Sequence, residues 1–307
     1  MPRVLLTGAT GFIGRRIMRD LQAHGYDVLV ALRSPAMLPR GIAPIIVGDL
    51  GSNPHWEPVL DCVDAVIHTA AIAHTHGISD SVYEQINTQA TLDLANAAAD
   101  AGVARFIFLS SIRAQSGPTS DRLLIEADPP HPTDAYGRSK LNAENGLALI
   151  RDMDWVALRP VLVYGTGVKG NMARFMQLAR MPIPLPFKNL TAQRSLVSLD
   201  NVSRAILTVL AYPRPLKRPL IVAEPTPLSI PDMIIAMRRG LNRKPLLFPV
   251  KQEWLEKVAH YTRKTDILER FTGSLIADST ALLSLGWQPE QNTSEQLASL
   301  MTKTYLS

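Results

Sequence analysis

A glycine-rich turn near the N-terminus constrains the fold more than any other feature of this 307-residue chain. Gly8, Gly11 and Gly14 follow the apolar run 4–6, which has the length of a short buried strand. The segment after them has apolar residues at helical spacing and ends at Gly25, a residue typical of helix C-termini. Such glycines permit a tight turn and bring a pyrophosphate close to the unpaired N–H groups of the helix. The turn therefore predicts a dinucleotide site in an α/β fold.

Strand and helix patterns alternate from residue 4 to about residue 159, which indicates a parallel sheet with helices on both faces. We expect strands near 4–6, 27–32, 45–47, 65–68, 106–110 and 155–159, and long helices near 81–101 and 136–151. The predicted fold class is α/β, a Rossmann-type doubly wound parallel sheet with a smaller C-terminal α/β substrate-binding portion.

Proline clusters at 181–186 and 213–219 indicate loops in the second half of the chain. We therefore expect a dinucleotide-binding domain in residues 1–160 and a mainly substrate-binding portion in 161–307. Residues 191–222 are expected to return to the main sheet, with a strand near 195–198 and a helix after Asp200.

Ser111, Tyr136 and Lys140 have the types and spacing that redox chemistry on a hydroxyl or a ketone requires. A phenol with a pKa near ~10 is a poor base at neutral pH. Lys140, four residues after Tyr136, lies on the same helical face and can favour the phenolate. The Ser111 hydroxyl can hydrogen-bond the reacting oxygen. A Tyr-x-x-x-Lys pair also arises by chance as a solvated pair, but the preceding strand and the glycine turn favour the catalytic interpretation.

Together these motifs resemble the extended short-chain dehydrogenase/reductase family, which includes nucleotide-sugar epimerases, dehydratases and 4-ketoreductases. The resemblance covers nearly the whole chain and implies that Ser111, Tyr136 and Lys140 are catalytic. It also implies a nicotinamide dinucleotide cofactor. The implied cofactor-binding residues are Gly8, Thr10, Gly11, Phe12, Ile13, Arg33, Asp49, Leu50, Thr69, Ala70, Ala71, Asn87, Tyr136 and Lys140.

The end of the second predicted strand bears on the choice of cofactor. NAD-binding relatives place a carboxylate there for the ribose hydroxyls, whereas this chain has Leu32 and Arg33. A guanidinium binds phosphate in a bidentate manner, so Arg33 can pair with a 2′-phosphate. The alternative is a surface arginine that stacks on the adenine or has no role. We therefore expect NADP(H), with NAD(H) as the alternative.

On the substrate side, the resemblance assigns Asn171 and Arg194 to a diphosphate. Arg270 is a further candidate that a helix-terminal salt bridge explains equally well. Arg113, where relatives have a small hydroxyl residue, adds a cation beside Ser111, and both belong to the expected substrate-binding set. No acid after Ser111 is placed to remove a proton from C5, which disfavours a 4,6-dehydratase.

These residues predict an NAD(P)-dependent oxidoreductase acting at C4 of a nucleotide sugar, as a 4-keto sugar reductase or dehydrogenase in surface polysaccharide synthesis. A UDP-sugar 4-epimerase would use the same residues and differ in cofactor stoichiometry. A small-ketone reductase and a non-catalytic dinucleotide sensor are further alternatives. The intact catalytic residues disfavour the sensor.

Composition limits the other classes. The net charge of +5 is scattered, which fits an anionic small substrate better than a nucleic acid. No run of 18 apolar residues occurs, and the early strand leaves no room for a signal peptide, so we expect no membrane partner and a cytoplasmic location. The single Cys62 fits a reducing compartment. His74 and His76 have no third ligand at a recognisable spacing, and no metal is expected.

In relatives the two long helices often form a dimer interface, and a homodimer is expected here. The apolar stripe of Leu92, Leu94, Ala95 and Ala98 is equally consistent with ordinary core.

Overall fold

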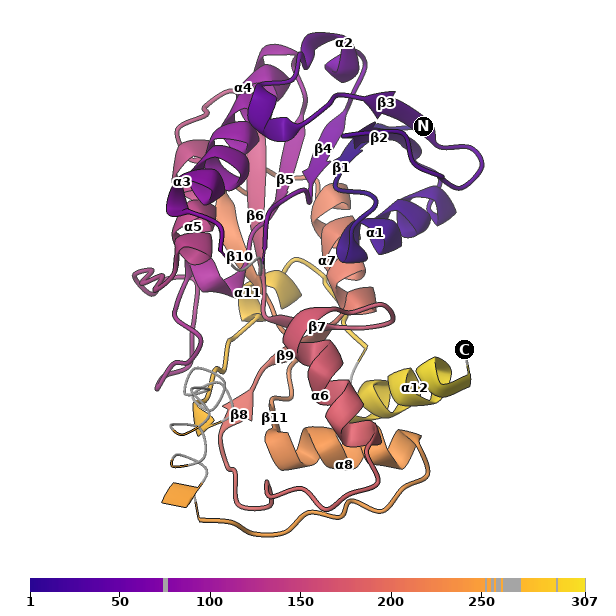
Figure 1. The fold of residues 1–307 in the computed structure, drawn as a ribbon. Coiled ribbons are helices and arrows are strands. Elements are labelled where there is room, and N and C mark those ends of the chain that lie inside the picture. The colour runs from indigo at the N-terminus through magenta and orange to yellow at the C-terminus, as the bar shows by residue number, and fades with distance from the viewer. Residues whose placement is uncertain are drawn as a thin grey trace.

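The computed structural model describes residues 1–73, 77–251, 253–254, 257, 261, 272–290 and 292–306. A seven-stranded sheet in the order β10-β6-β5-β4-β1-β2-β3 forms its upper half (Figure 1). Every pair of neighbours in this sheet is parallel. The strands are β1 (Arg3–Thr7), β2 (Asp27–Leu32), β3 (Ala43–Ile46), β4 (Ala65–His68), β5 (Arg105–Leu109), β6 (Asp154–Pro160) and β10 (Arg218–Val222).

The strand order reverses beside β1, because the chain runs outward through β2 and β3 and then returns to the other side of β1 as β4. In open α/β sheets, ligands bind at such a reversal, beyond the carboxyl ends of the strands. The predicted Rossmann-type doubly wound sheet is confirmed, and the reversal places the glycine turn at the expected ligand site.

Helices cover both faces of this sheet (Figure 1). On one face, α1 (Phe12–Ala23) packs against α7 (Leu199–Ala211). The other face carries α2 (Glu57–Leu60), α4 (Ala90–Asp100) and α5 (Ala135–Leu147). The predicted helix near 81–101 is made of α3 (Asp80–Tyr83), the π-helical segment η2 (Glu84–Gln89) and α4.

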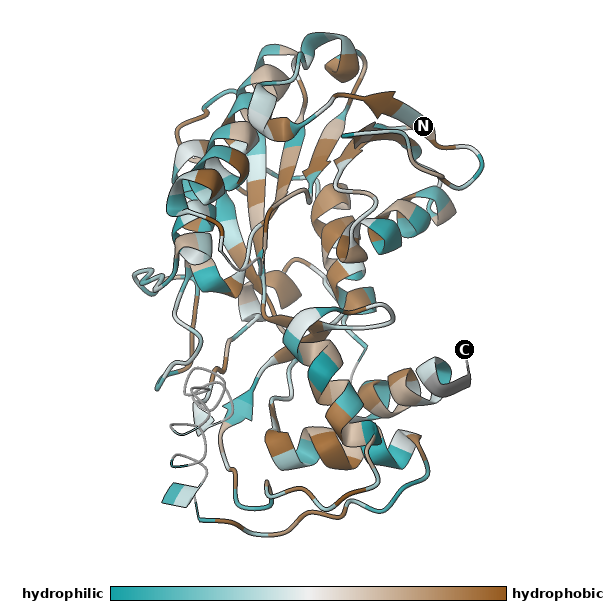
Figure 2. Cartoon of the chain, in the orientation of Figure 1, coloured by the Kyte–Doolittle hydropathy of each residue, from teal (hydrophilic) through white to brown (hydrophobic). Residues whose placement is uncertain are grey.

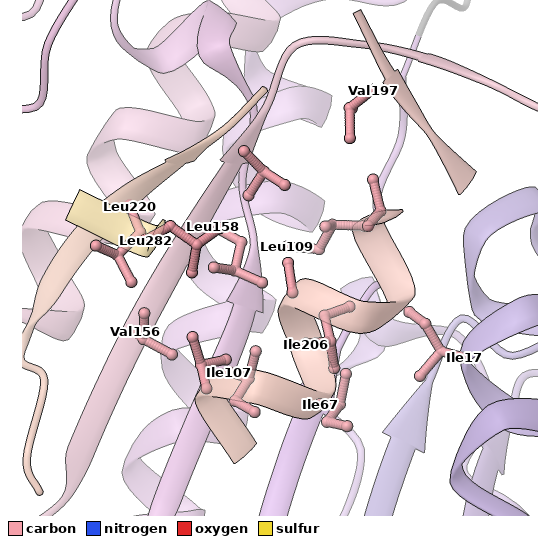
Figure 3. Packing of buried hydrophobic residues seen from close by; sticks show 14 of the residues in the cluster. Ile17, Ile67, Ile107, Leu109, Val156, Leu158, Val197, Ile206, Leu220 and Leu282 are labelled. Atoms are coloured by element: carbon pink, nitrogen blue, oxygen red, sulfur yellow. The ribbon is translucent and has the colours of Figure 1, made fainter. Parts of the chain in front are cut away.

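Both faces of the sheet are buried except at the edge strand β3, so the other strands are apolar along most of their length (Figure 2). In Figure 3, Ile67, Ile107 and Val156 from three adjacent strands lie beside Ile206 of α7. Leu94, Ala95 and Ala98 are completely buried in the core on the opposite face. These three residues of the apolar stripe are therefore core, and the homodimer stays a prediction.

The lower half has a separate core between α6 (Gly170–Arg180), α8 (Ile230–Gly240) and α12 (Thr293–Leu306). Two small sheets complete the strands: β7 (Leu162–Tyr164) pairs with β9 (Leu196–Ser198), and β8 (Gln193–Arg194) pairs with β11 (Leu228–Ser229). The short helical elements η1 (Leu50–Ser52), η3 (Ile112–Ala114) and α11 (Thr280–Leu283) complete the described fold.

Within residues 191–222, β10 enters the main sheet and α7 packs on it, but the strand at 196–198 does not. The expectation that this strand returns to the main sheet is therefore wrong. The reason is that β10 already occupies the outer edge of β6, leaving β9 to pair with β7.

In the part of the chain that the structure describes, no helix has the length and apolar character needed to span a bilayer. The same residues contain no cluster of three His, Cys, Asp or Glu able to hold a metal. His74, His76 and Arg270 lie outside the described residues.

Candidate active site

The glycine turn folds against the loop that follows β4. Gly8 has φ +72°, in the left-handed region that favours glycine. A Cβ on Gly8 would lie 2.6 Å from both the Thr69 hydroxyl and the Ala70 amide nitrogen, and a Cβ on Gly14 would lie 2.2 Å from the Gly8 carbonyl oxygen. The first and third glycines are thus required for close packing of the two loops and of helix α1.

Gly11 has a different role, because a Cβ there would meet only the Gly8 carbonyl oxygen, at 3.1 Å. It is the N-cap of α1 with an extended backbone, and no side chain caps this helix end. The first-turn N–H groups of a helix lack intrahelical partners and attract anions. The space above Gly11 and this uncapped helix end fit the pyrophosphate of a dinucleotide.

Alanine at the two positions should separate packing from binding. Gly14→Ala should lower the free energy of unfolding by about 1–3 kcal/mol, because its methyl group overlaps the Gly8 backbone. Gly11→Ala should preserve the melting temperature and weaken binding of a nicotinamide dinucleotide about tenfold, which corresponds to about 1.4 kcal/mol. Thermal unfolding and calorimetric titration with NAD and with NADP measure the two effects. A Gly11→Ala protein that binds both dinucleotides as tightly as wild type would contradict the assignment.

His68, the last residue of β4, connects strand β1 to helix α4 through the two nitrogens of its ring. Its Nδ1 lies 2.8 Å from the Thr7 hydroxyl and its Nε2 lies 3.1 Å from the Thr91 hydroxyl. Burial, assisted by the charge of Lys140, lowers the pKa of His68 to about 3, so the ring is neutral at physiological pH. Thr7 in turn accepts from the Thr69 hydroxyl through its carbonyl oxygen at 2.7 Å. The neutral His68 ring therefore holds Thr7 and Thr91 in place beside the candidate dinucleotide site.

At the opposite end of the site, Arg33 and Asp49 are both exposed and lie 4.0 Å apart as an ion pair. Asp49 also accepts from the Gly51 amide at 2.9 Å, as the N-cap of η1. Arg33 thus faces a carboxylate in the described structure, which offsets the positive charge expected to attract a 2′-phosphate.

Asn87 is completely buried, and its predicted contact to a dinucleotide stays a prediction. Its side-chain amide exchanges hydrogen bonds with the main chain of Ile72 at 2.9 and 3.0 Å, and donates to the Ser139 hydroxyl at 3.1 Å. Asn87 therefore ties the loop after β4 to α5, and the helix pattern alone did not reveal this role.

Ser111 and Tyr136 are brought together across the ends of β5 and α5. Ser111 is the N-cap of η3, and its hydroxyl accepts from the Arg113 amide at 3.2 Å. Tyr136 is the second residue of α5, and its ring packs edge-on to Tyr83 with centroids 6.3 Å apart. Burial raises the pKa of Tyr136 to about 12, although its hydrogen bond with Ser111 acts in the opposite direction. The phenol is protonated at neutral pH.

Lys140, one helical turn after Tyr136 in α5, contacts the end of β5. Its ammonium donates to the Leu109 carbonyl oxygen at 2.9 Å and lies 4.4 Å from the centroid of the Phe108 ring. Burial lowers the pKa of Lys140 to about 7, against the opposing effect of Glu144. The structure thus shows a raised Tyr136 pKa instead of the lowering expected from Lys140, because burial outweighs the nearby charges.

A buried polar network that the sequence did not reveal supports the site. Glu144, one helical turn after Lys140, accepts from the Ser110 hydroxyl at 2.5 Å and from the Arg159 guanidinium at 2.5–3.1 Å. Arg159 also donates to the side-chain oxygen of Gln115. All four of these side chains are at most 4% exposed. The i+4 spacing from Lys140 to Glu144 was the available signal.

The predicted substrate-binding residues lie on several elements. Asn171 is exposed in the first turn of α6, whose N-terminus has no side-chain cap. Arg194 on β8 donates to the Pro118 carbonyl oxygen at 3.1 Å. Arg113 is held by Asp134 at 2.6 Å. Their contacts with a substrate remain predictions.

The doubly wound sheet with a glycine turn at its strand reversal is a Rossmann-type dinucleotide-binding fold. The sequence pattern of the NAD dependent epimerase/dehydratase family matches residues 4–222, and this chain belongs to that family. Its cofactor is accordingly a nicotinamide dinucleotide.

Individual proteins are similar over nearly the whole chain. The UDP-glucose 4-epimerase of Vibrio cholerae is 35% identical, over 96% of this chain and 93% of its own length. The structure of MoeE5 in complex with UDP-glucose and NAD is 26% identical with a TM-score of 0.76, covering 99% of this chain and 100% of that one. The UDP-glucose 4-epimerase of Thermotoga maritima, at 22% identity and a TM-score of 0.76, covers 99% of this chain and 100% of its own and shares the fold.

Proposed function

We propose that this protein is a UDP-sugar 4-epimerase in which Ser111, Tyr136 and Lys140 form the catalytic site. The hydrogen-bonded Ser111–Tyr136 pair at the carboxyl edge of the sheet carries this proposal. The 35% identity to the V. cholerae UDP-glucose 4-epimerase supports the epimerase over the reductase that the sequence favoured, and the UDP-glucose bound in MoeE5 supports a UDP-sugar substrate.

A bound nicotinamide would supply the hydride acceptor and donor for C4 of the sugar, and epimerisation would require the hydride to return to the opposite face of that carbon. Tyr136 removes the proton from the C4 hydroxyl and later returns it to the ketone oxygen, which the Ser111 hydroxyl holds by a hydrogen bond. Proton removal requires the Tyr136 pKa to fall from about 12 when ligands bind. Lys140, when protonated, contributes positive charge of the sign that favours the phenolate.

A 4-keto sugar reductase is the second candidate, and the protonation state of Tyr136 favours it. A phenol with a pKa of about 12 is ready to donate a proton to a ketone oxygen at neutral pH. Reduction would need no prior loss of the tyrosine proton. The two candidates therefore share residues and differ in whether the cofactor is consumed.

We propose NAD(H) as the cofactor, in place of the NADP(H) expected from Arg33. The family description specifies NAD, and MoeE5 was solved with NAD. The Arg33–Asp49 ion pair is consistent with this choice, since Asp49 would repel a 2′-phosphate while its oxygens can accept from ribose hydroxyls. The homodimer, the cytoplasmic location and the role in surface polysaccharide synthesis remain parts of the proposal.

The test is cofactor stoichiometry. Purified protein is incubated with UDP-glucose, and the sugar is followed by NMR while nicotinamide absorbance is recorded. The epimerase predicts formation of UDP-galactose with no net change in NADH. Parallel incubations contain a UDP-4-keto-6-deoxy-N-acetylhexosamine with NADH or NADPH. Loss of one reduced cofactor per sugar there, with no C4 interconversion of UDP-glucose, would select the reductase.

A further inference from the structure

The two segments that carry Ser111 and Tyr136 are pressed together at one point. Gly137, immediately after Tyr136, lies against the main chain of Arg113, two residues after Ser111. A Cβ on Gly137 would lie 2.3 Å from the Arg113 carbonyl oxygen. Helix α5 therefore begins in direct backbone contact with η3, and a shift between them would separate the serine from the tyrosine.

One carboxylate joins these segments through both of its oxygens. Asp134 is the N-cap of α5, and its Oδ1 accepts from the Gly137 amide at 2.7 Å. Its Oδ2 accepts from the Arg113 guanidinium at 2.6 Å. Partial burial opposes the charge on Asp134, but the hydrogen bonds from Arg113 and Gly137 keep its pKa below the usual value. The carboxylate is thus ionised at neutral pH.

The cation of the pair is more buried than its partner. The Arg113 side chain is 16% exposed, and its second terminal nitrogen is buried without a hydrogen-bond partner. An unsatisfied buried donor costs free energy, typically about 1–3 kcal/mol, and calls for an explanation. In an ordinary surface ion pair the guanidinium stays in contact with water, whereas the Arg113 guanidinium is largely buried.

Both charges act on the same phenol in opposite directions. Arg113 lowers the Tyr136 pKa, whereas Asp134 raises it. Burial has the largest influence on the Tyr136 pKa. The other groups that act on the phenol are the Ser111 hydroxyl and Tyr83. Two further cations are nearby: Lys140 lies one turn along α5, and Arg138 acts on Asp134. Two opposite charges therefore act on the phenol, one from a largely buried guanidinium and one from a half-exposed carboxylate.

We propose that Arg113 and Asp134 are a positioning pair that locks the Ser111 turn onto the first turn of α5 and balances opposite charges beside the Tyr136 hydroxyl. This inference rests on the proposed function for its catalytic meaning. The contacts and the charges of the pair do not depend on which reaction the protein catalyses.

The test uses the protein with bound NAD and tyrosine labelled with ¹³C at Cζ, the carbon bearing the hydroxyl. The Tyr136 signal is assigned by its loss in Tyr136→Phe. Asp134→Asn keeps a good N-cap but removes the negative charge, so the phenolate-to-phenol ratio at pH 10 should rise about tenfold. Arg113→Gln removes the positive charge, and the same ratio should fall about tenfold.

Two controls separate this role from general stability. Arg113→Lys keeps the charge and should titrate like wild type, and Arg113→Met, which also removes the charge, replaces Arg113→Gln if that variant does not fold. Arg204→Gln breaks a remote exposed pair with Glu290 and should have no effect on the Tyr136 signal. Ratios that move in the same direction in the Asp134 and Arg113 variants, or that do not move, overturn the proposal.

Kinetics give an independent readout. If the pair acts on Tyr136, the acid limb of the pH–kcat profile moves to lower pH in Asp134→Asn and to higher pH in Arg113→Gln. Unchanged acid limbs would overturn the proposal. The titration of the labelled tyrosine needs no sugar substrate. Absence of any UDP-sugar turnover by wild type would therefore contradict the proposed function while leaving the titration to decide the positioning pair.

Discussion

Replacing Tyr136 with phenylalanine should lower kcat for the C4 reaction about 10²–10⁴-fold, the range typical for loss of a general acid–base group. The phenol is the proton carrier in the proposed mechanism, and it is hydrogen-bonded to Ser111 in the free protein. Phenylalanine keeps the edge-on packing against Tyr83 but has no proton to exchange. KM should change little, because the hydroxyl contributes more to the transition state than to ground-state binding.

Steady-state kinetics at matched protein concentration measure this effect. The matched control is Tyr26→Phe, since Tyr26 packs against the core beside α1 and lies outside the proposed site. That variant should retain wild-type kcat and report any general cost of losing a phenol. Substantial turnover by Tyr136→Phe would exclude Tyr136 as the proton carrier.

The second large effect concerns stability. Arg159→Met should lower the free energy of unfolding by about 3–5 kcal/mol, because it leaves the buried Glu144 carboxylate without its cation. Both side chains are 4% exposed, so water cannot replace the lost partner. Urea unfolding of the variant and wild type measures the difference.

The double variant Glu144→Gln/Arg159→Met provides the control. Removing both charges relieves the uncompensated carboxylate and should recover much of the loss, since a buried ion pair is often replaceable by neutral groups. The Ser110 hydroxyl, which donates to Glu144 in the wild type, keeps an acceptor in the amide oxygen of the introduced glutamine, and this preserves the turn before Ser111. Equal destabilisation in the single and double variants would mean that the Arg159 loss arises from packing instead of charge.

Local patterns were sufficient for the sheet and for the position of the site. The strands 27–32 and 65–68 are observed with the predicted bounds, because buried parallel strands are short apolar runs bounded by turns. The glycine spacing located the turn at the strand reversal, since close packing restricts Gly8 and Gly14 to glycine. The patterns themselves lie within short segments of the chain, although the atoms that restrict Gly8 belong to Thr69 and Ala70 of a distant loop.

The rest depends on contacts between distant segments. Glu144 and Arg159 are ordinary charged residues in sequence, and only folding shows that they are buried together beneath Ser110. The direction of the Tyr136 pKa was likewise unpredictable, because burial dominates it. Strand 196–198 was misplaced because the competition between β9 and β10 for β6 is a property of the assembled sheet.

The most direct test of the central claim is the fate of a deuterium placed at C4 of UDP-glucose. Hydride transfer to a nicotinamide and back predicts UDP-galactose that retains deuterium at C4 in ordinary water, with slower turnover than the unlabelled sugar. NMR of the product reports the label. Exchange of this deuterium for solvent hydrogen would show proton abstraction at carbon and would contradict the redox account.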